Sequence, residues 1–175
     1  MNDPDRNRRR MARLMTHLTW VVVLAMLTLY FNNFIASRDN PNATLALSDS
    51  ARPEVVLDRN RAGHYLAPGR INGQRVEFLL DTGATNVSVP QGLASELGLQ
   101  RGAPMQSMTA NGVVTVYRTQ LDSVELGGIR MQDVSATINP GMSENIVLLG
   151  MSFMQHLELI QRNGQLTLRV PDAVR

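Results

Sequence analysis

The stretch Val76–Pro90, VEFLLDTGATNVSVP, decides the fold and raises the question of function. An apolar run that is typical of a buried strand ends on the carboxylate of Asp81, and Thr82, Gly83 and Ala84 follow at once. A carboxylate at the inner end of a buried strand is costly unless it is paired, hydrogen-bonded or used in chemistry. Asp and Gly are also common turn residues. Asp81 is therefore either a turn residue or an acid that takes part in catalysis.

A cluster of arginines near the N-terminus contributes much to the basic pI of the chain. The 175 residues leave room for one domain and an appendage, and the formal net charge is only +2. A basic cluster often indicates nucleic-acid binding, but the apolar segment that follows this one favours a different interpretation. The cluster consists of Arg6, Arg8, Arg9, Arg10 and Arg13.

The segment Leu14–Ile35 contains no Asp, Glu, Lys or Arg, and Trp20 and Tyr30 lie near its two ends. About twenty apolar residues span a bilayer, and aromatic residues favour the interfaces. We therefore predict a basic cytoplasmic N-terminus over 1–13 and a transmembrane anchor over 14–36. The alternative is a cleavable signal peptide, which fits less well because bulky or charged residues, Phe34 and Arg38 among them, follow the apolar core.

The distribution of arginines predicts the orientation of the anchor. Five arginines precede the span and only Arg38 follows closely, so the N-terminus is expected inside the cell. The rest of the chain would then lie outside the cytoplasm. In a Gram-negative bacterium this means a single-pass protein of the inner membrane with a periplasmic domain, and we expect no nucleic-acid partner.

The exported part begins with a polar segment over 37–53, which we interpret as a flexible tether. From 54 to 171 the pattern changes to short strands separated by Gly, Asn and Pro. The dipeptide Asn72-Gly73 predicts a tight hairpin, since both residues accept positive φ. Asn111-Gly112 and Gly127-Gly128 predict two further hairpins.

Helical signals in this part are few. Gln91–Leu97 is predicted as a short helix after Pro90, and Ser152–Leu159 as a second one. Gln165–Val170 alternates apolar and polar residues and is predicted as a strand. The pattern indicates a small all-β, barrel-like domain with a short C-terminal helix.

Two segments of this domain are similar. Phe78–Gly83 (FLLDTG) and Val147–Ser152 (VLLGMS) each place apolar residues in a strand and then turn. Each also follows a hairpin that turns on glycine. An imperfect twofold repeat explains both segments, although apolar hexamers also resemble each other by chance.

Together these features resemble the retropepsin-like aspartic proteases (clan AA), and in particular the bacterial, membrane-anchored members of this family. The resemblance covers roughly residues 55–170. The residues that carry it are GHYLAPGRINGQRVEFLLDTGATNVSVP, TANG, LDSVELGGI and LLGMSFMQHLE. It implies a closed β-barrel, a catalytic Asp81 in Asp-Thr-Gly, and an apolar segment with Leu148, Leu149 and Gly150 behind the catalytic loop.

The resemblance also implies a homodimer. Peptide hydrolysis by carboxylates needs two of them, one to deprotonate a water and one to protonate the carbonyl oxygen. The chain has one Asp-Thr-Gly, since Asp122-Ser123-Val124 fails at the third position. Two copies of Asp81 would meet across a twofold axis and share one proton. The expected activity is that of an aspartic endopeptidase acting on protein or peptide substrates, without cofactor.

Supporting residues follow from the same resemblance. Thr82 would hydrogen-bond across the dimer, and Gly83 lets the backbone approach the carboxylate. Ala84 stands where many two-lobed relatives have serine, which predicts activity less shifted toward acid. The hairpin around Asn111-Gly112 would be the flap that closes over the peptide. Its tip residues are Thr109, Ala110, Asn111 and Gly112.

Other chemistries have little support in the sequence. The chain has no cysteine and three histidines without metal-ligand spacing, so no metal site is expected. No G-x-S-x-G motif and no glycine-rich phosphate loop occur. The main alternative is a non-catalytic module that uses the retropepsin fold for dimerisation or peptide binding, with Asp81 as a vestige.

Overall fold

The structure is a computed structural model, and it describes residues 4–45, 54–109 and 112–171. The chain separates into two units, Met1–Arg38 and Asp39–Arg175. All but the last residue of helix α1 (Pro4–Asp39) makes up the described part of the first unit. Its segment Met11–Asp39 is the one helix among the described residues that is long and apolar enough to cross a membrane, a property that a signal sequence shares.

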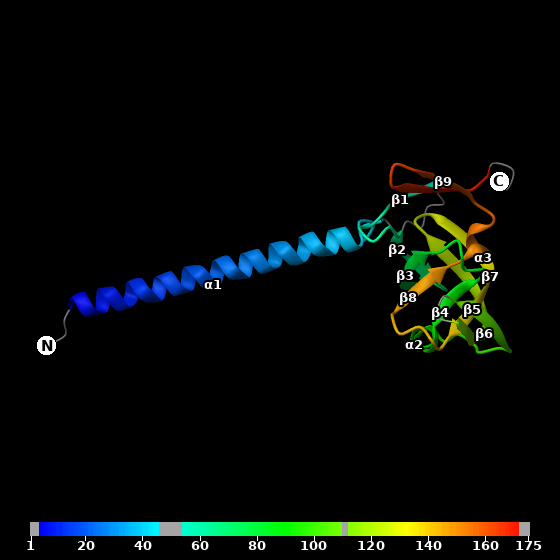
Figure 1. The fold of residues 1–175 in the computed structure, drawn as a ribbon, viewed down its shortest axis with the longest axis horizontal. Helices are drawn as coiled ribbons and strands as arrows, with labels where there is room; N and C mark the ends of the chain where they lie inside the picture. Colours follow the sequence, from blue (N-terminus) through cyan, green and yellow to red (C-terminus); the bar gives the residue numbers. More distant parts are fainter. Residues whose placement is uncertain (1–3, 46–53, 110–111, 172–175) are drawn as a thin grey trace. The chain divides into compact units, whose positions relative to one another are not determined.

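The second unit contains a closed β-barrel (Figure 1). Six strands follow one another around the barrel in the order β2-β3-β8-β4-β7-β6, and β6 pairs with β2 to close the ring. Strand β5 (Pro104–Thr109) pairs with β6 at the end of this series. The predicted all-β barrel is therefore confirmed. The ring strands are β2 (Leu66–Ile71), β3 (Gln74–Leu80), β4 (Val87–Pro90), β6 (Gly112–Leu126), β7 (Ile129–Asn139) and β8 (Ile146–Leu149).

Two of the predicted hairpins are confirmed by the strand register. Ile71 pairs with Gln74 across Asn72 and Gly73, whose φ angles of 50° and 81° suit a tight turn with two left-handed residues. Leu126 pairs with Ile129 across the Gly-Gly dipeptide. The third hairpin joins β5 to β6. There Thr109 pairs with Gly112, so the loop is one residue earlier than predicted, at 110–111, outside the described residues.

The barrel interior holds the core. Phe78 on β3 and Phe153 behind β8 are completely buried, and they are the largest of the fully buried side chains. Strands β3 and β8, which are far apart in the sequence, pair in parallel. The short helix α2 (Gln91–Glu96), predicted after Pro90, contributes Leu93 and Ala94 to the same core.

A second, three-stranded sheet lies at one end of the barrel (Figure 1). Its order is β1 (Glu54–Asp58), β10 (Gln165–Arg169), β9 (Glu158–Arg162), and all pairs are antiparallel. The predicted C-terminal strand therefore exists, but it is the central strand of this sheet. Both edges of β10 are paired, one with β1 and the other with β9.

The predicted helix Ser152–Leu159 is too long. Helix α3 covers only Met151–Met154, and the chain enters β9 four residues later. The signal for this strand is Asn163-Gly164, whose φ angles of 49° and 79° form the tight turn between β9 and β10. It is the same dipeptide that marks the hairpin at Asn72, and the sequence prediction overlooked it.

The predicted flexible tether over 37–53 is wrong for the first half of that segment. Helix α1 continues to Asp39, and Asn42 is buried among the strands. The Nδ2 atom of Asn42 donates to the carbonyl oxygens of Asp58 and Leu66 at 2.8 Å, and its Oδ1 accepts the N–H of Asp58 at 2.8 Å. Leu45 packs against the hydrophobic core. Residues 40–45 are thus part of the folded domain, and residues 46–53 lie outside the described residues.

Candidate active site

Asp81 follows β3 directly and begins a tight loop. Its carboxylate oxygen Oδ1 accepts the N–H of Gly83 at 2.9 Å, and its carbonyl oxygen accepts the N–H of Ala84 at 3.2 Å. A Cβ atom at Gly83 would lie 3.2 Å from the Asp81 carboxylate, which is tighter than an ordinary contact. The loop therefore holds a partly exposed carboxylate in a defined orientation.

The segment after β8 fixes this loop from behind. The N–H of Asp81 donates to Leu149 O at 3.2 Å, Met151 N–H to Ala84 O at 2.8 Å, and Ser152 N–H to Thr85 O at 2.9 Å. The hydroxyl of Ser152 accepts the N–H of Val87 at 2.9 Å. These four bonds leave the loop with little freedom to move relative to β8.

Gly150 makes this close approach possible. A Cβ atom at this position would lie 2.3 Å from Asn86 O and 2.7 Å from Ala84 O, distances that real Cβ atoms essentially never show. The backbone at Gly150 is extended, with φ −89° and ψ −173°, so any residue could adopt the conformation. The requirement for glycine is thus one of space.

The two similar hexamers of the sequence lie side by side. Strands β3 and β8 pair in parallel with Phe78 opposite Val147, Leu79 opposite Leu148 and Leu80 opposite Leu149. This register equals the register in which the hexamers align. Asp81 and Gly150 therefore start two loops at the same level, which is the arrangement that a repeated strand-and-turn unit produces.

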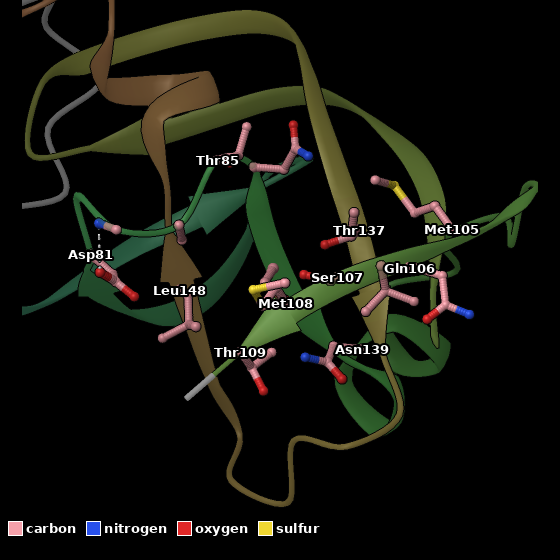
Figure 2. A pocket seen from close by; sticks show the side chains of 15 residues that line it. Asp81, Thr85, Met105, Gln106, Ser107, Met108, Thr109, Thr137, Asn139 and Leu148 are labelled. Carbon is pink, nitrogen blue, oxygen red and sulfur yellow. Dashed lines mark hydrogen bonds between the residues drawn. The ribbon is translucent and has the colours of Figure 1, made fainter. Parts of the chain in front are cut away.

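A cleft of about 680 Å³ opens beside Asp81 (Figure 2). The β3–β4 loop, the ring strands β4, β7 and β8, and the β5–β6 hairpin all contribute to it. Asp81 is the only ionisable side chain among the described residues that line it. The lining consists of Asp81, Gly83, Ala84, Thr85, Asn86, Ser88, Met105, Gln106, Ser107, Met108, Thr109, Val116, Thr137, Asn139 and Leu148.

The β5–β6 hairpin forms one wall of the cleft with residues 105–109. Thr109 donates its hydroxyl to Gly112 O at 2.8 Å at the base of the turn. Met108 is 88% exposed although it lines the cleft, and its cross-strand neighbour Val113 is 61% exposed. Ala110 and Asn111, predicted as the flap tip, lie outside the described residues.

The structure separates the predicted site residues into two groups. Asp81, Gly83, Ala84, Thr109 and Leu148 line one cleft, whereas Leu149 and Gly150 lie buried behind the loop. Thr82 is exposed and does not line the cleft, and its contact across a dimer stays a prediction.

Sequence reasoning missed several residues of the site. Ser152 is one, because its bond to Val87 spans 65 positions of the chain. Thr137 and Asn139 are two more, and they reach the cleft because β7 pairs with β4 in parallel. Their signal was two polar residues alternating with Ile138 at the end of an apolar strand.

No group of three or more His, Asp or Glu side chains that could hold a metal ion occurs among the described residues.

Comparisons with known proteins agree with this geometry. The model of the family described as "gag-polyprotein putative aspartyl protease" matches residues 67–156. A solved structure, the crystal structure of a retropepsin-like aspartic protease from Rickettsia conorii, is similar with a TM-score of 0.57 and 27% identity. That similarity covers 67% of this chain and 90% of the other.

Two curated relatives are uncharacterized proteins. One, from Sinorhizobium sp and described as lying in the cobV 5′ region, is 30% identical over 161 residues, which are 85% of this chain and 69% of that protein. The other, from Rickettsia prowazekii (strain Madrid E), is 26% identical over 108 residues, which are 60% of this chain and 46% of that protein. The family model matches just over half of this chain, and Asp81 lies in the loop between β3 and β4. The chain therefore belongs to the retropepsin-like aspartyl protease family.

Proposed function

We propose that the chain is a membrane-anchored, homodimeric aspartic endopeptidase in which each protomer supplies one Asp81. The observation that carries this proposal is the lone carboxylate in the cleft. A dyad needs two acids close together, and Asp81 is the only acid that the described cleft residues include. A second copy of Asp81 across a twofold axis provides the missing group.

The chemistry would divide between identical residues. Two carboxylates at about 3 Å cannot both be ionised, so the pair holds one proton. The ionised member takes a proton from the attacking water, and the protonated member donates to the carbonyl oxygen of the peptide bond. The β5–β6 hairpin would cover the bound peptide and exclude bulk water.

The anchor supports a membrane location for this activity. Helix α1 has the length and composition of a membrane span, and the arginines before it favour a cytoplasmic N-terminus and a periplasmic catalytic domain. A mature chain that keeps residues 4–39 in membrane fractions, measured by mass spectrometry, supports the anchor. A mature chain that begins after Asp39 would instead show a cleaved signal sequence.

The protease assignment is tested with the full chain in detergent micelles and a proteome-derived peptide library. Cleavage that disappears in Asp81→Asn, and that a statine-type transition-state mimic inhibits while metal chelators do not, supports it. A purified, folded dimer that cleaves nothing in the library would favour the alternative, a non-catalytic dimerisation or peptide-binding module.

A further inference from the structure

Three buried polar residues line the cleft away from the catalytic loop. Ser88 on β4 lies opposite Thr137 on β7 in the parallel pair, and Asn139 follows two positions later on the same face of β7. Their exposed fractions are only 9%, 7% and 9%. Figure 2 shows Thr137 and Asn139 on the opposite side of the cleft from Asp81. We name these three residues the polar subsite.

The polar subsite presents hydrogen-bonding atoms that the protein does not use. Asn139 Oδ1 accepts the N–H of Gly141 at 2.9 Å, which orients the amide and leaves its Nδ2 as a donor. Within the described residues, neither this Nδ2 nor the hydroxyl of Thr137 has a hydrogen-bond partner, and the hydroxyl of Ser88 contacts only the weak acceptor Sδ of Met142 at 3.5 Å.

Such groups are unusual in a folded protein, because nearly all buried polar atoms are paired. In this domain, no fully enclosed side-chain nitrogen or oxygen among the described residues lacks a partner. The free atoms of the polar subsite are therefore the ones that face the cleft. They are positioned to bind a group that enters it.

The surroundings define the chemistry of that group. Leu148 lies opposite Ser88 in the β4–β8 pair, and Met105 lines the cleft from β5, so apolar side chains lie beside neutral polar ones such as Gln106 and Ser107. Among the described residues that line the cleft there is no lysine, arginine or histidine, and Asp81 is the one acid. The pocket therefore disfavours charged side chains and favours a neutral group that can both donate and accept hydrogen bonds.

We propose that Ser88, Thr137 and Asn139 form a specificity subsite that selects a carboxamide side chain, Asn or Gln, in the substrate. The carbonyl oxygen of the carboxamide accepts from Asn139 Nδ2, and its NH₂ group donates to the hydroxyl oxygens of Thr137 and Ser88. Leucine has similar size but leaves these buried groups unpaired, and a site built for hydrogen bonds rejects such an analogue strongly. This inference rests on the proposed peptide-binding role of the cleft.

The test measures preference with the full chain in detergent micelles. A peptide library first identifies the substrate position that prefers Asn or Gln, and two peptides are then made that differ only by Gln or Leu at that position. We expect kcat/KM to favour the Gln peptide by about 10- to 100-fold. Thr137→Val should lower this ratio by about tenfold, and Asn139→Leu should abolish or reverse it.

The variants separate recognition from structural damage. In Thr137→Val, kcat/KM for the Leu peptide should stay equal or rise, whereas a damaged fold would lower both rates. Thr137→Ser keeps the hydroxyl and should restore the preference. Thr119→Val makes the same change on the neighbouring strand β6, outside the cleft lining, and should leave the ratio unchanged. Ser88→Ala is a second variant with the same expected direction.

Binding provides a measurement that does not need catalysis. Full-length Asp81→Asn should bind the fluorescent Gln peptide more tightly than the Leu peptide, and Thr137→Val added to it should remove the difference. Equal binding, or equal kcat/KM ratios in wild type and all subsite variants, would overturn the subsite and leave the protease assignment standing. Absence of cleavage together with a retained Gln preference in binding would overturn the protease assignment alone.

Discussion

Asp81 donates its backbone N–H to the carbonyl oxygen of Leu149 at 3.2 Å, so the loop that carries the carboxylate is fixed to the strand behind it. The bond extends the parallel pairing of β3 and β8 by one residue. Because Leu149 is completely buried, the position of Asp81 is set by the barrel core. Substitutions behind the loop should therefore change both activity and stability, whereas substitutions of the carboxylate itself should change activity alone.

Asp81→Asn should remove activity and leave the fold intact. The asparagine Oδ1 can still accept the N–H of Gly83, so the loop keeps its bond. We expect peptide cleavage to fall at least about 100-fold, since acid–base catalysis is lost, with unchanged circular dichroism and thermal midpoint. Asp122→Asn, at an exposed site on β6, is the matched control and should retain full activity. Equal rates for Asp81→Asn and wild type would exclude Asp81 as the catalytic acid.

Gly150→Ala should reduce stability and activity together. Its new Cβ would meet backbone oxygen atoms of Ala84 and Asn86 at 2.7 and 2.3 Å, and backbone cannot rotate away as a side chain can. Overpacking of this kind costs about 1–3 kcal/mol of unfolding free energy, measurable by urea denaturation.

Gly92→Ala is the control for Gly150. A Cβ at Gly92 meets nothing within 4 Å, and the residue lies in helix α2. We expect it to be neutral or to stabilise by up to about 1 kcal/mol. Loss of activity in Gly150→Ala at unchanged stability would contradict the predicted clash of the new Cβ with the backbone oxygens of Ala84 and Asn86.

Asn42→Ala should destabilise the domain although the residue lies close to the predicted anchor. The change leaves the carbonyl oxygens of Asp58 and Leu66 and the N–H of Asp58 without their partner. An unpaired buried group costs about 1–3 kcal/mol. Asn145→Ala, at an exposed position, should change the unfolding free energy by less than about 0.5 kcal/mol. Equal stability of the two variants would show that residues 40–45 act as a free tether.

The sequence predicted the barrel because its determinants are local. Turn dipeptides such as Asn72-Gly73 fix φ within two residues, and the apolar alternation of the strands fixes which side chains face the core. The candidate catalytic loop could be predicted for the same reason, since Asp-Thr-Gly is contiguous.

The remainder depends on pairings between distant segments. Thr137 lines the cleft because β7 pairs with β4, and the hydroxyl of Ser152 accepts the N–H of Val87, 65 residues away. Asn42 donates to the carbonyl oxygens of two strand residues that follow it by 16 and 24 positions. No local sequence pattern predicts these contacts. The central place of β10 was missed because the predicted helix Ser152–Leu159 extended into the first two residues of β9 and the turn at Asn163-Gly164 was overlooked.

Deletion of residues 165–175 should prevent folding. It removes the central strand of the β1-β10-β9 sheet together with the buried side chains of Leu166 and Leu168, and it uncovers Leu57 on β1. Loss of two buried leucines alone costs about 4–10 kcal/mol, comparable to the whole stability of a domain. Circular dichroism should show loss of the β-sheet signal of the domain, while the helical signal of α1 remains. A domain that folds without residues 165–175 would contradict this expectation.

The central claim is that one active site needs Asp81 from two chains. Wild-type and Asp81→Asn chains with different affinity tags can be co-expressed in equal amounts, and mixed dimers can be isolated by tandem affinity purification. Random pairing gives about a quarter wild-type dimers and about half mixed dimers. A preparation in which both tagged chains are wild type controls for effects of the tags.

The measurement is the cleavage rate per wild-type chain, with native mass spectrometry confirming the dimer composition. Our account predicts that isolated mixed dimers are inactive and that the unfractionated mixture retains about half of the activity per wild-type chain. Mixed dimers with undiminished activity per wild-type chain would contradict it, because each chain would then carry a complete catalytic site of its own.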